Sequence, residues 1–331
     1  MLRRRRPTIA AVYNLPDDGE AATREDIAEY NAIGEAARRA GYDVRAVNIS
    51  NRLDRLERAL RHPRPDAVLN LVESFSGDAR LEFAVASLYE LHGIAYTGSP
   101  PSALMTCQRK GFTKHLMRSA GIVSPRYRIL FEPELPVRHG LRYPVIVKPA
   151  REDGSLGVDE GSVVRRHRDA LERVRKLFRE YRPPILVEEY IEGRELHVAI
   201  LGNRRRRVLP LLEYDFARLA EGRAHIMTHE AKWNPSKRRG PRQVCPAPLA
   251  PEIAHRVHEA ALAVYELTGC RDYARLDTRI APDGQVYVIE ANPNPDLSEG
   301  DAYLLCAAVG GLSFSDVIGK IVGFALQRRD R

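Results

Sequence analysis

The first hundred residues alternate runs of strand length with runs of helical periodicity. The expected order is strand 8–13, helix 24–40, strand 43–48, helix 53–61, strand 67–72, helix 79–92 and strand 94–97. Such alternation predicts a parallel sheet with helices on both faces. The first and third strands would end near Asn14 and Glu73, at the crevice where sheets of this kind bind ligands. No G-x-G-x-x-G motif follows the first strand, which argues against a dinucleotide site.

The length of 331 residues exceeds one ordinary core, so two or three domains are expected. Apolar residues make up 44% and charged residues 29%, as in globular proteins, and no apolar run reaches the length of about 18 residues that a membrane span needs. The basic start precedes too short an apolar run for a signal peptide, so a cytoplasmic location is expected. Four cysteines without paired spacing indicate neither a zinc site nor a disulfide framework.

The net charge of +8 comes mostly from arginines spread along the chain. A nucleic-acid-binding module would gather such charge among exposed aromatic residues. The short run 204–207 follows Gly202-Asn203 and is typical of a solvated turn. We therefore expect no nucleic-acid or membrane partner, because an anionic small molecule explains the charge more simply.

Two strands near the end of the chain place oxygen-bearing side chains on one face. The expected turn is 281–284, with Ile280 paired to Gln285. Alternation then puts four residues on one face: Asp277, Val288, Glu290 and Asn292. Carboxylates with an amide oxygen suit a hard ion such as Mg²⁺, which also takes phosphate oxygens. The same pattern fits an acidic turn on a solvated edge hairpin.

Two further segments carry candidate binding groups. Lys148 ends an apolar strand and precedes a loop with Gly154 and Gly157, which could place a cation and backbone N–H groups on a polyphosphate. A plain hairpin would look the same. Residues 188–195 form a strand that ends in carboxylates and a glycine turn, and their backbone could hold adenine. A surface hairpin is the alternative there.

The order of these pieces resembles the ATP-grasp superfamily, and within it the D-alanine–D-alanine ligase family. The resemblance covers nearly the whole chain, and it rests on these motifs: Lys110-Gly-Phe-Thr-Lys114, the Lys148 loop, residues 188–195, Glu230-Ala-Lys232-Trp233, Arg275-Leu-Asp277 and Glu290-Ala-Asn292. It implies an α/β fold that is α+β in its C-terminal part. A Rossmann-like parallel sheet (1–100) would be followed by two α+β subdomains that enclose ATP, the central one with the glycine loop (101–200) and the C-terminal one with the metal site (201–331).

The resemblance also implies roles for individual residues in holding ATP. Nucleotide phosphates would contact Lys110, Lys148 and Lys232. The mobile phosphate lid would comprise Gly154, Ser155 and Gly157. Adenine would lie against Glu188, Glu189, Tyr190 and Ile191, and the ribose against Glu195.

For catalysis, the resemblance implies a metal site, with Mn²⁺ as a substitute for Mg²⁺. Two ions would be held by Asp277, Glu290 and Asn292. Arg275 would stabilise the oxyanion of the tetrahedral intermediate, assisted by Ser155 and Lys232. A carboxylate would attack the γ-phosphate to give an acylphosphate, and an amine would then displace phosphate. No nucleophilic serine or cysteine is needed.

The candidate substrate residues are those where this chain departs from the family or carries an acid near the expected crevice: Glu20, Glu73, Trp233, Asp296 and Asp301. Asp296 stands where the family has a glycine whose N–H helps the oxyanion. Asp301 aligns with the serine that grips the second substrate's carboxylate, and a carboxylate there would repel that group by about 1–2 kcal/mol.

The predicted function is therefore an ATP-dependent carboxylate–amine ligase that resembles D-alanine–D-alanine ligases and acts on amino-acid or amine substrates. Three alternatives remain open: a ligase for a different pair of substrates, a nucleotide-binding regulator that no longer catalyses, and a nucleic-acid module. Retention of the complete set of ATP and metal residues argues against a regulator, since binding alone does not need it. A homodimer is compatible with the sequence.

Overall fold

The computed structural model describes residues 5–16, 24–152, 154–219, 222–233 and 240–329. Its first sheet is parallel, with the strand order β2-β1-β3. The strands are β1 (Thr8–Tyr13), β2 (Asp43–Asn48) and β3 (Ala67–Asn70). The helices between and after them are α1 (Arg24–Arg39), α2 (Leu53–Arg61), a 3₁₀ turn (Ala79–Leu81) and α3 (Glu82–Leu91). The predicted strand 94–97 contributes only one bridge, between Val68 and Tyr96.

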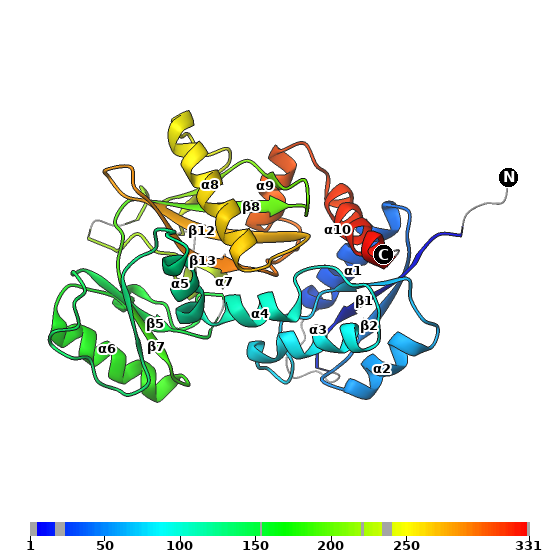
Figure 1. Ribbon diagram of the computed structural model, residues 1–331, viewed down its shortest axis with the longest axis horizontal. Helices are drawn as coiled ribbons and strands as arrows, with labels where there is room; N and C mark the ends of the chain where they lie inside the picture. Colours follow the sequence, from blue (N-terminus) through cyan, green and yellow to red (C-terminus); the bar gives the residue numbers. More distant parts are fainter. Residues whose placement is uncertain (1–4, 17–23, 153, 220–221, 234–239, 330–331) are drawn as a thin grey trace.

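Both faces of this sheet are covered, as the alternating pattern predicts. Ala10 and Val12 pack with α2 and α3, whereas Ile9 and Ala11 pack with α1. A second helix, α10 (Phe314–Arg329), packs on the same face of the sheet as α1, and it comes from the far end of the chain. Figure 1 shows α10 lying beside α1 over the N-terminal strands. The last helix thus completes the first core.

The second sheet is antiparallel, in the order β4-β7-β5-β6. Its strands are β4 (Tyr127–Leu130), β5 (Val145–Pro149), β6 (Val163–Val164) and β7 (Ile185–Glu189). A second 3₁₀ turn (Glu160–Ser162) precedes β6. One face packs on α6 (His167–Glu180), through Val145, Val147 and Val187. Alternation along β5 and β7 therefore sends Lys148 and Glu188 to the opposite face.

The third sheet contains six strands, in the order β11-β10-β8-β12-β13 with β9 paired to β8. The strands are β8 (Arg194–Leu201), β9 (Arg207–Val208), β10 (Leu212–Asp215), β11 (Arg242–Val244), β12 (Tyr273–Ile280) and β13 (Val286–Asn292). One face packs on α8 (Pro251–Leu267). Residues 209–211 separate β9 from β10.

Helical periodicity predicts one helix over residues 106–120, and this prediction is wrong, because the chain forms two helices here. They are α4 (Pro101–Gln108) and α5 (Lys110–Ser119), separated at Arg109, whose ψ of 76° is not helical. Lys110 therefore begins a helix, and Lys114 follows one turn later on the same face. Both lysines are buried.

The predicted register of the final hairpin is wrong by one residue. A β-bulge nevertheless brings Asp277 and Glu290 to the same face of the sheet. Ile280 pairs with Val286 instead of Gln285, and Thr278 pairs with Val288. A shift between Asp277 and Thr278 then sets Asp277 directly opposite Glu290. Val288 consequently packs into the core under α8 and is not on the face of Asp277.

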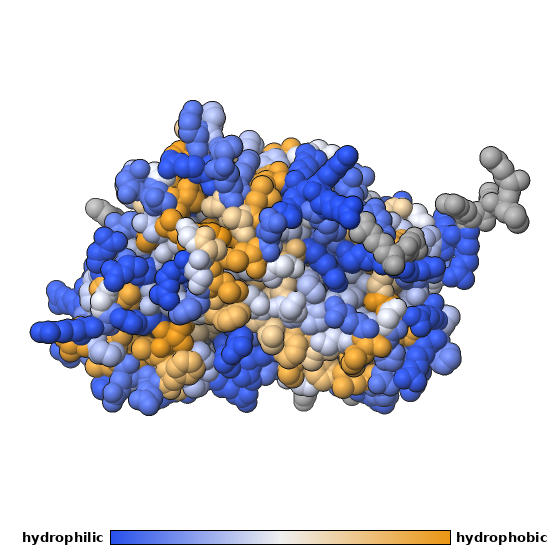
Figure 2. Space-filling model, in the orientation of Figure 1, coloured by the Kyte–Doolittle hydropathy of each residue, from blue (hydrophilic) through white to orange (hydrophobic). Residues whose placement is uncertain are grey.

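Two short helices lie outside the sequence prediction, α7 (His229–Trp233) and α9 (Ala302–Val309). Among the described residues, no single helix is long and apolar enough to cross a membrane; α9 and α10 meet that test only as a pair bent by 103°. Hydrophilic residues are spread over the whole face seen in Figure 2, with apolar residues in smaller patches between them.

Candidate active site

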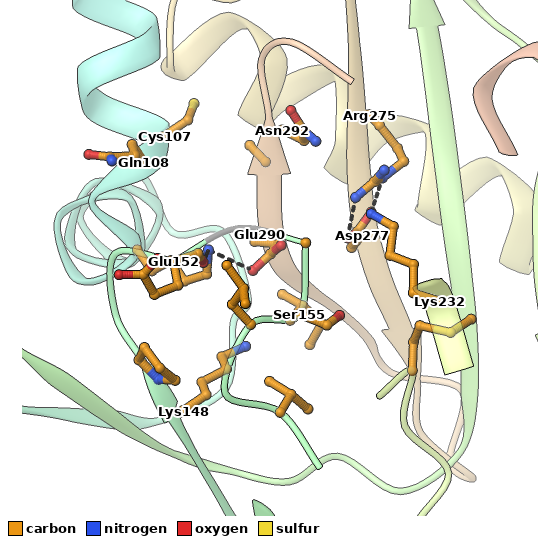
Figure 3. Close-up of a pocket in the computed structure, with 18 of the residues that line it drawn as sticks. Cys107, Gln108, Lys148, Glu152, Ser155, Lys232, Arg275, Asp277, Glu290 and Asn292 are labelled. Carbon is orange, nitrogen blue, oxygen red and sulfur yellow. Dashed lines mark hydrogen bonds and ion pairs between the residues drawn. The ribbon is translucent and has the colours of Figure 1, made fainter. Parts of the chain in front are cut away.

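A cavity of about 650 Å³ lies where the three sheets meet, and it collects most of the residues predicted from the sequence. Those that line it are Glu73, Lys110, Lys148, Gly154, Ser155, Glu188, Glu189, Tyr190, Ile191, Glu195, Lys232, Arg275, Asp277, Glu290, Asn292, Asp296 and Asp301. Glu20 lies outside the described residues, as does the side chain of Trp233. Figure 3 shows residues of β12 and β13 on one side of the cavity and Lys148 with the Ser155 loop on another.

The metal-site candidates come from neighbouring strands at one end of the cavity. Asp277 is opposite Glu290, and Arg275 is opposite Asn292. Arg275 donates to both oxygens of Asp277, at 2.8 and 3.2 Å. Burial alone would raise the pKa of Asp277, but the Arg275 charge lowers it overall. The pKa of Glu290 is likewise lowered, because Lys110 and Lys148 outweigh its burial. Both carboxylates are therefore ionised at neutral pH.

A cluster of lysines faces these carboxylates from α5 and β5. Glu188 contacts Lys114 Nζ at 2.7 Å and Lys148 Nζ at 2.8 Å, while Lys110 Nζ is 3.5 Å from Glu290 Oε2. Although burial raises the pKa of Glu188, the two lysines bring it to about 2. The glutamate thus stays charged and holds Lys148 at the cavity wall.

The glycine loop after β5 has the backbone that its sequence predicts, but its two glycines serve different purposes. Gly154 and Ser155 have φ of 61° and 63° and line the cavity. Lys110 Nζ donates to the Glu152 carbonyl at 2.8 Å and ties the loop to α5. Gly157 belongs to the same loop but does not line the cavity. A Cβ there would lie 2.6 Å from Pro149, so the glycine lets the loop pack on β5.

The candidate adenine segment follows β7. The Glu189 side chain accepts from the backbone N–H of Arg142 at 2.9 Å and its guanidinium at 3.2 Å, so this side chain anchors the strand. Glu195 pairs with Arg279 at 2.5 Å. Arg279 lines the cavity and lies outside the residues that the sequence singled out.

His197 is a second cavity residue that the sequence analysis missed. Its Nε2 is 3.4 Å from Asp277 Oδ1, and its ring packs edge-on against Tyr214. Burial lowers the pKa of His197 to about 3, so the imidazole is neutral. His197 and Arg279 each stand two residues from a predicted site residue on the same strand. Strand alternation was the signal that could have found them.

The candidate substrate residues lie towards the N-terminal sheet. Asp301 caps α9 by accepting from the Tyr303 N–H at 3.0 Å, and burial raises its pKa more than Arg275 lowers it. Asp296 accepts from the Ser298 N–H at 2.7 Å. Asn294 donates to Glu82 at 2.7 Å and joins the end of the hairpin to the N-terminal part. An acidic end thus opposes the lysine-rich end of the cavity.

Two antiparallel sheets share a cavity lined with lysines and carboxylates, beside a parallel sheet, as the resemblance to the ATP-grasp class of enzymes implies. A family model described as D-ala D-ala ligase C-terminus matches residues 116–323. A D-alanine–D-alanine ligase of Desulforudis audaxviator is 30% identical, over 94% of this chain and 97% of that protein. Protein y4sG of Sinorhizobium fredii is 37% identical, over 79% of this chain and 75% of that one.

Among solved structures, the D-alanine–D-alanine ligase of Bacillus anthracis complexed with ATP has a TM-score of 0.78 at 22% identity, covering 98% of this chain and 99% of that one. This likeness confirms the fold. The chain belongs to the D-alanine–D-alanine ligase family, and it is an ATP-dependent ligase of that family.

Proposed function

We propose that this cavity joins a carboxylate to an amine at the expense of ATP, as in the D-alanine–D-alanine ligases of the family. The observation that carries the proposal is the row of Arg275, Asp277 and Glu290 facing Lys110 and Lys148 across one cavity. Such a site can hold a polyphosphate and stabilise negative charge on transferring oxygens.

The residues at the hairpin end fit Mg²⁺, and we propose that Asp277, Glu290 and Asn292 hold two such ions, with Mn²⁺ as a substitute. The donors proposed are the carboxylates of Asp277 and Glu290, which lie opposite each other on β12 and β13, and the amide oxygen of Asn292 on β13. Both carboxylates are ionised and contact cationic side chains, as expected for ligands of a hard cation. Bound Mg²⁺ would neutralise charge on the phosphates.

We assign the nucleotide as follows. Lys110, Lys148 and Lys232 bind the phosphates, with Ser155 and the backbone at Gly154 covering them. The backbone of residues 188–191 holds adenine, and Glu195 accepts from the ribose hydroxyls. Lys148 suits this role because Glu188 and Glu290 raise its pKa against the effect of burial, so it remains a cation.

In the proposed reaction the substrate carboxylate attacks the γ-phosphate, and the amine then attacks the resulting acylphosphate. Negative charge gathers on oxygen in both steps. Arg275 would stabilise the oxyanion, because Asp277 raises its pKa despite burial and fixes its orientation. Lys232 would neutralise the departing phosphate.

The alternative to D-alanine–D-alanine ligation concerns the second substrate. One observation favours a second substrate that is an amine without a free carboxylate, or an amine with a second cationic group. Asp296 and Asp301 both line the cavity at its acidic end. A Streptomyces coelicolor relative described as “Putative D-alanine–D-lactate ligase” is 34% identical over 80% of this chain and 74% of that protein, and its description gives a second substrate other than D-alanine. We therefore propose D-alanine as the first substrate. We expect the carboxylates of Asp296 and Asp301 to select the second substrate.

A substrate screen tests the proposal. Phosphate release with ATP and Mg²⁺ would be measured against D-alanine alone and against D-alanine with D-lactate, amino acids and diamines. We expect release in at least one arm and its loss by at least about a hundredfold in Glu290→Gln, since one ligand and one charge disappear. Glu259→Gln on α8, whose side chain is 66% exposed, is the matched control and should keep full activity. Full turnover in Glu290→Gln would refute the metal assignment.

Three further properties follow as proposals. ATP as a cosubstrate and free thiols at all four cysteines fit a cytoplasmic location, which fractionation of the source cells would test. A homodimer is proposed from the family resemblance, and light scattering after size exclusion would measure it. We also propose unit boundaries near residues 100 and 200, with β8 (Arg194–Leu201) of the third sheet beginning shortly before the second boundary.

A further inference from the structure

Arg279 is a buried arginine on the cavity wall that belongs to none of the assigned roles. It is 4% exposed. Its Nη2 is 2.5 Å from Glu195 Oε2, and its Nη1 donates to the Ile191 carbonyl at 2.6 Å. Nη2 also donates to the His225 carbonyl. The guanidinium lies 4.7 Å from the centre of the Tyr190 ring. One side chain thus contacts three separate segments of the chain.

The sheet register places Arg279 at this point. Arg279 is directly opposite Glu195 in the β8–β12 pair, just as Asp277 is opposite His197. Alternation puts Arg279 on the same face as Asp277, one pleat further along β12. The candidate ribose carboxylate Glu195 therefore has Arg279 as a fixed cationic partner, whereas the candidate metal ligand Asp277 pairs with Arg275.

We propose that Arg279 is a positioning residue for the nucleotide: it orients Glu195 towards the sugar hydroxyls and fixes the adenine-binding backbone at Ile191. The proposal rests on the nucleotide assignment above. A guanidinium can donate to several acceptors in a fixed plane, which a lysine cannot do. A carboxylate has about four acceptor directions, so the ion pair leaves capacity for a sugar hydroxyl.

The contact with His225 extends this role to the segment before α7. The His225 carbonyl also accepts from the Tyr190 hydroxyl at 3.1 Å, and the His225 ring stacks on Phe216 with 5.4 Å between centres. Ile226 and Met227 from this segment line the cavity, as do His229 and Lys232 of α7, which follows it. Arg279 therefore links the sugar-binding carboxylate to the segment that carries Lys232 over the phosphates.

The test compares binding of ATP and of 2′-deoxy-ATP and 3′-deoxy-ATP to Arg279→Met, by calorimetry, together with kcat and KM. We expect the Kd for ATP to rise by at least about tenfold, because a tenfold change corresponds in free energy to the loss of one charge-assisted hydrogen bond. Preference for ATP over the deoxynucleotides should fall towards one, because Glu195 is no longer held. The effect should lie more in KM for ATP than in kcat.

A matched control is Arg206→Met. Arg206 pairs with Glu266 at 3.0 Å, and neither residue lines the cavity. This variant should keep the wild-type preference among the nucleotides. If Arg279→Met fails to fold, Arg279→Lys takes its place and should show a reduced preference, since the compact ammonium of lysine lacks the planar fork that reaches all three acceptors.

Two outcomes separate this inference from the nucleotide assignment itself. Wild-type protein that does not bind ATP would refute the nucleotide assignment. Wild-type protein that binds ATP while Arg279→Met and Arg279→Lys keep its discrimination against deoxynucleotides would refute the role of Arg279, whatever the variants do to stability.

Discussion

Glu188 is 2% exposed, and its carboxylate contacts lysines from two different elements, α5 and β5. A buried carboxylate keeps its charge only when such partners stay in place. Of the two lysines that contact Glu188, Lys114 has the structural role, because it is 1% exposed and also donates to the Ile289 carbonyl at 3.0 Å. It thereby joins α5 to the second and third sheets. Burial lowers the pKa of Lys114, which Glu188 only partly opposes.

At the residue scale, Lys114→Met should reduce the free energy of unfolding by about 3 kcal/mol, because it leaves Glu188 with one cation and the Ile289 carbonyl without this donor. Urea denaturation followed by fluorescence would measure it. Lys176→Met is the control, since Lys176 is 45% exposed and its pair with Asp159 is solvated. That change should stay within about 0.5 kcal/mol. Equal losses in the two variants would contradict the account.

At the scale of elements, the β7–β8 connection must pass close to the end of β12. Gly193 lies in this connection with φ of 128°, and a Cβ there would meet the Ile280 carbonyl oxygen at 2.0 Å. Only glycine satisfies both the backbone angle and the close approach. The candidate ribose residue Glu195 follows two residues later, so this turn sets where it lies.

Gly193→Ala should therefore destabilise the protein by at least about 2 kcal/mol, combining backbone strain with the clash. Gly41→Ala separates the two causes, because Gly41 has φ of 99° but nothing within 4 Å of the added Cβ. It should cost only about 1 kcal/mol. Thermal unfolding of the two variants side by side gives the comparison. A smaller loss in Gly193→Ala than in Gly41→Ala would show that the turn can move away from β12.

At the scale of the whole molecule, one buried carboxylate joins three distant parts of the chain. Asp272 is fully buried and pairs with both terminal nitrogens of Arg328 on α10, at 2.6 and 2.7 Å. It also accepts from the Gly98 N–H and from Asn203, each at 2.9 Å. The last helix, the end of the N-terminal part and the third sheet are therefore fixed together at one point.

Arg328→Met should lower the free energy of unfolding by about 3 kcal/mol, since Asp272 would keep its buried charge without its arginine. Scanning calorimetry should show a lower Tm. The neighbouring Arg329 pairs with Asp66 but is 50% exposed, so Arg329→Met should change little. If the two variants melted together, α10 would not depend on Asp272 for its docking.

Strand and helix alternation was enough to predict the N-terminal sheet, because the periodicity of apolar residues is a local property. The helix break at Arg109 was not predictable in this way, since both halves have helical patterns and only the packing of α4 and α5 separates them. The helix α9 was missed because it is apolar on all sides and has little periodicity.

For the candidate site, the sequence by itself determined the residue types and their order: lysines before and after the glycine loop, then carboxylates and an amide on the final hairpin. The tertiary structure alone decided which of them meet. A bulge sets Asp277 opposite Glu290, Lys114 supports Glu188, and Arg279 holds Glu195. These contacts join residues far apart in the chain, and their geometry depends on strand register and core packing, which no local pattern encodes.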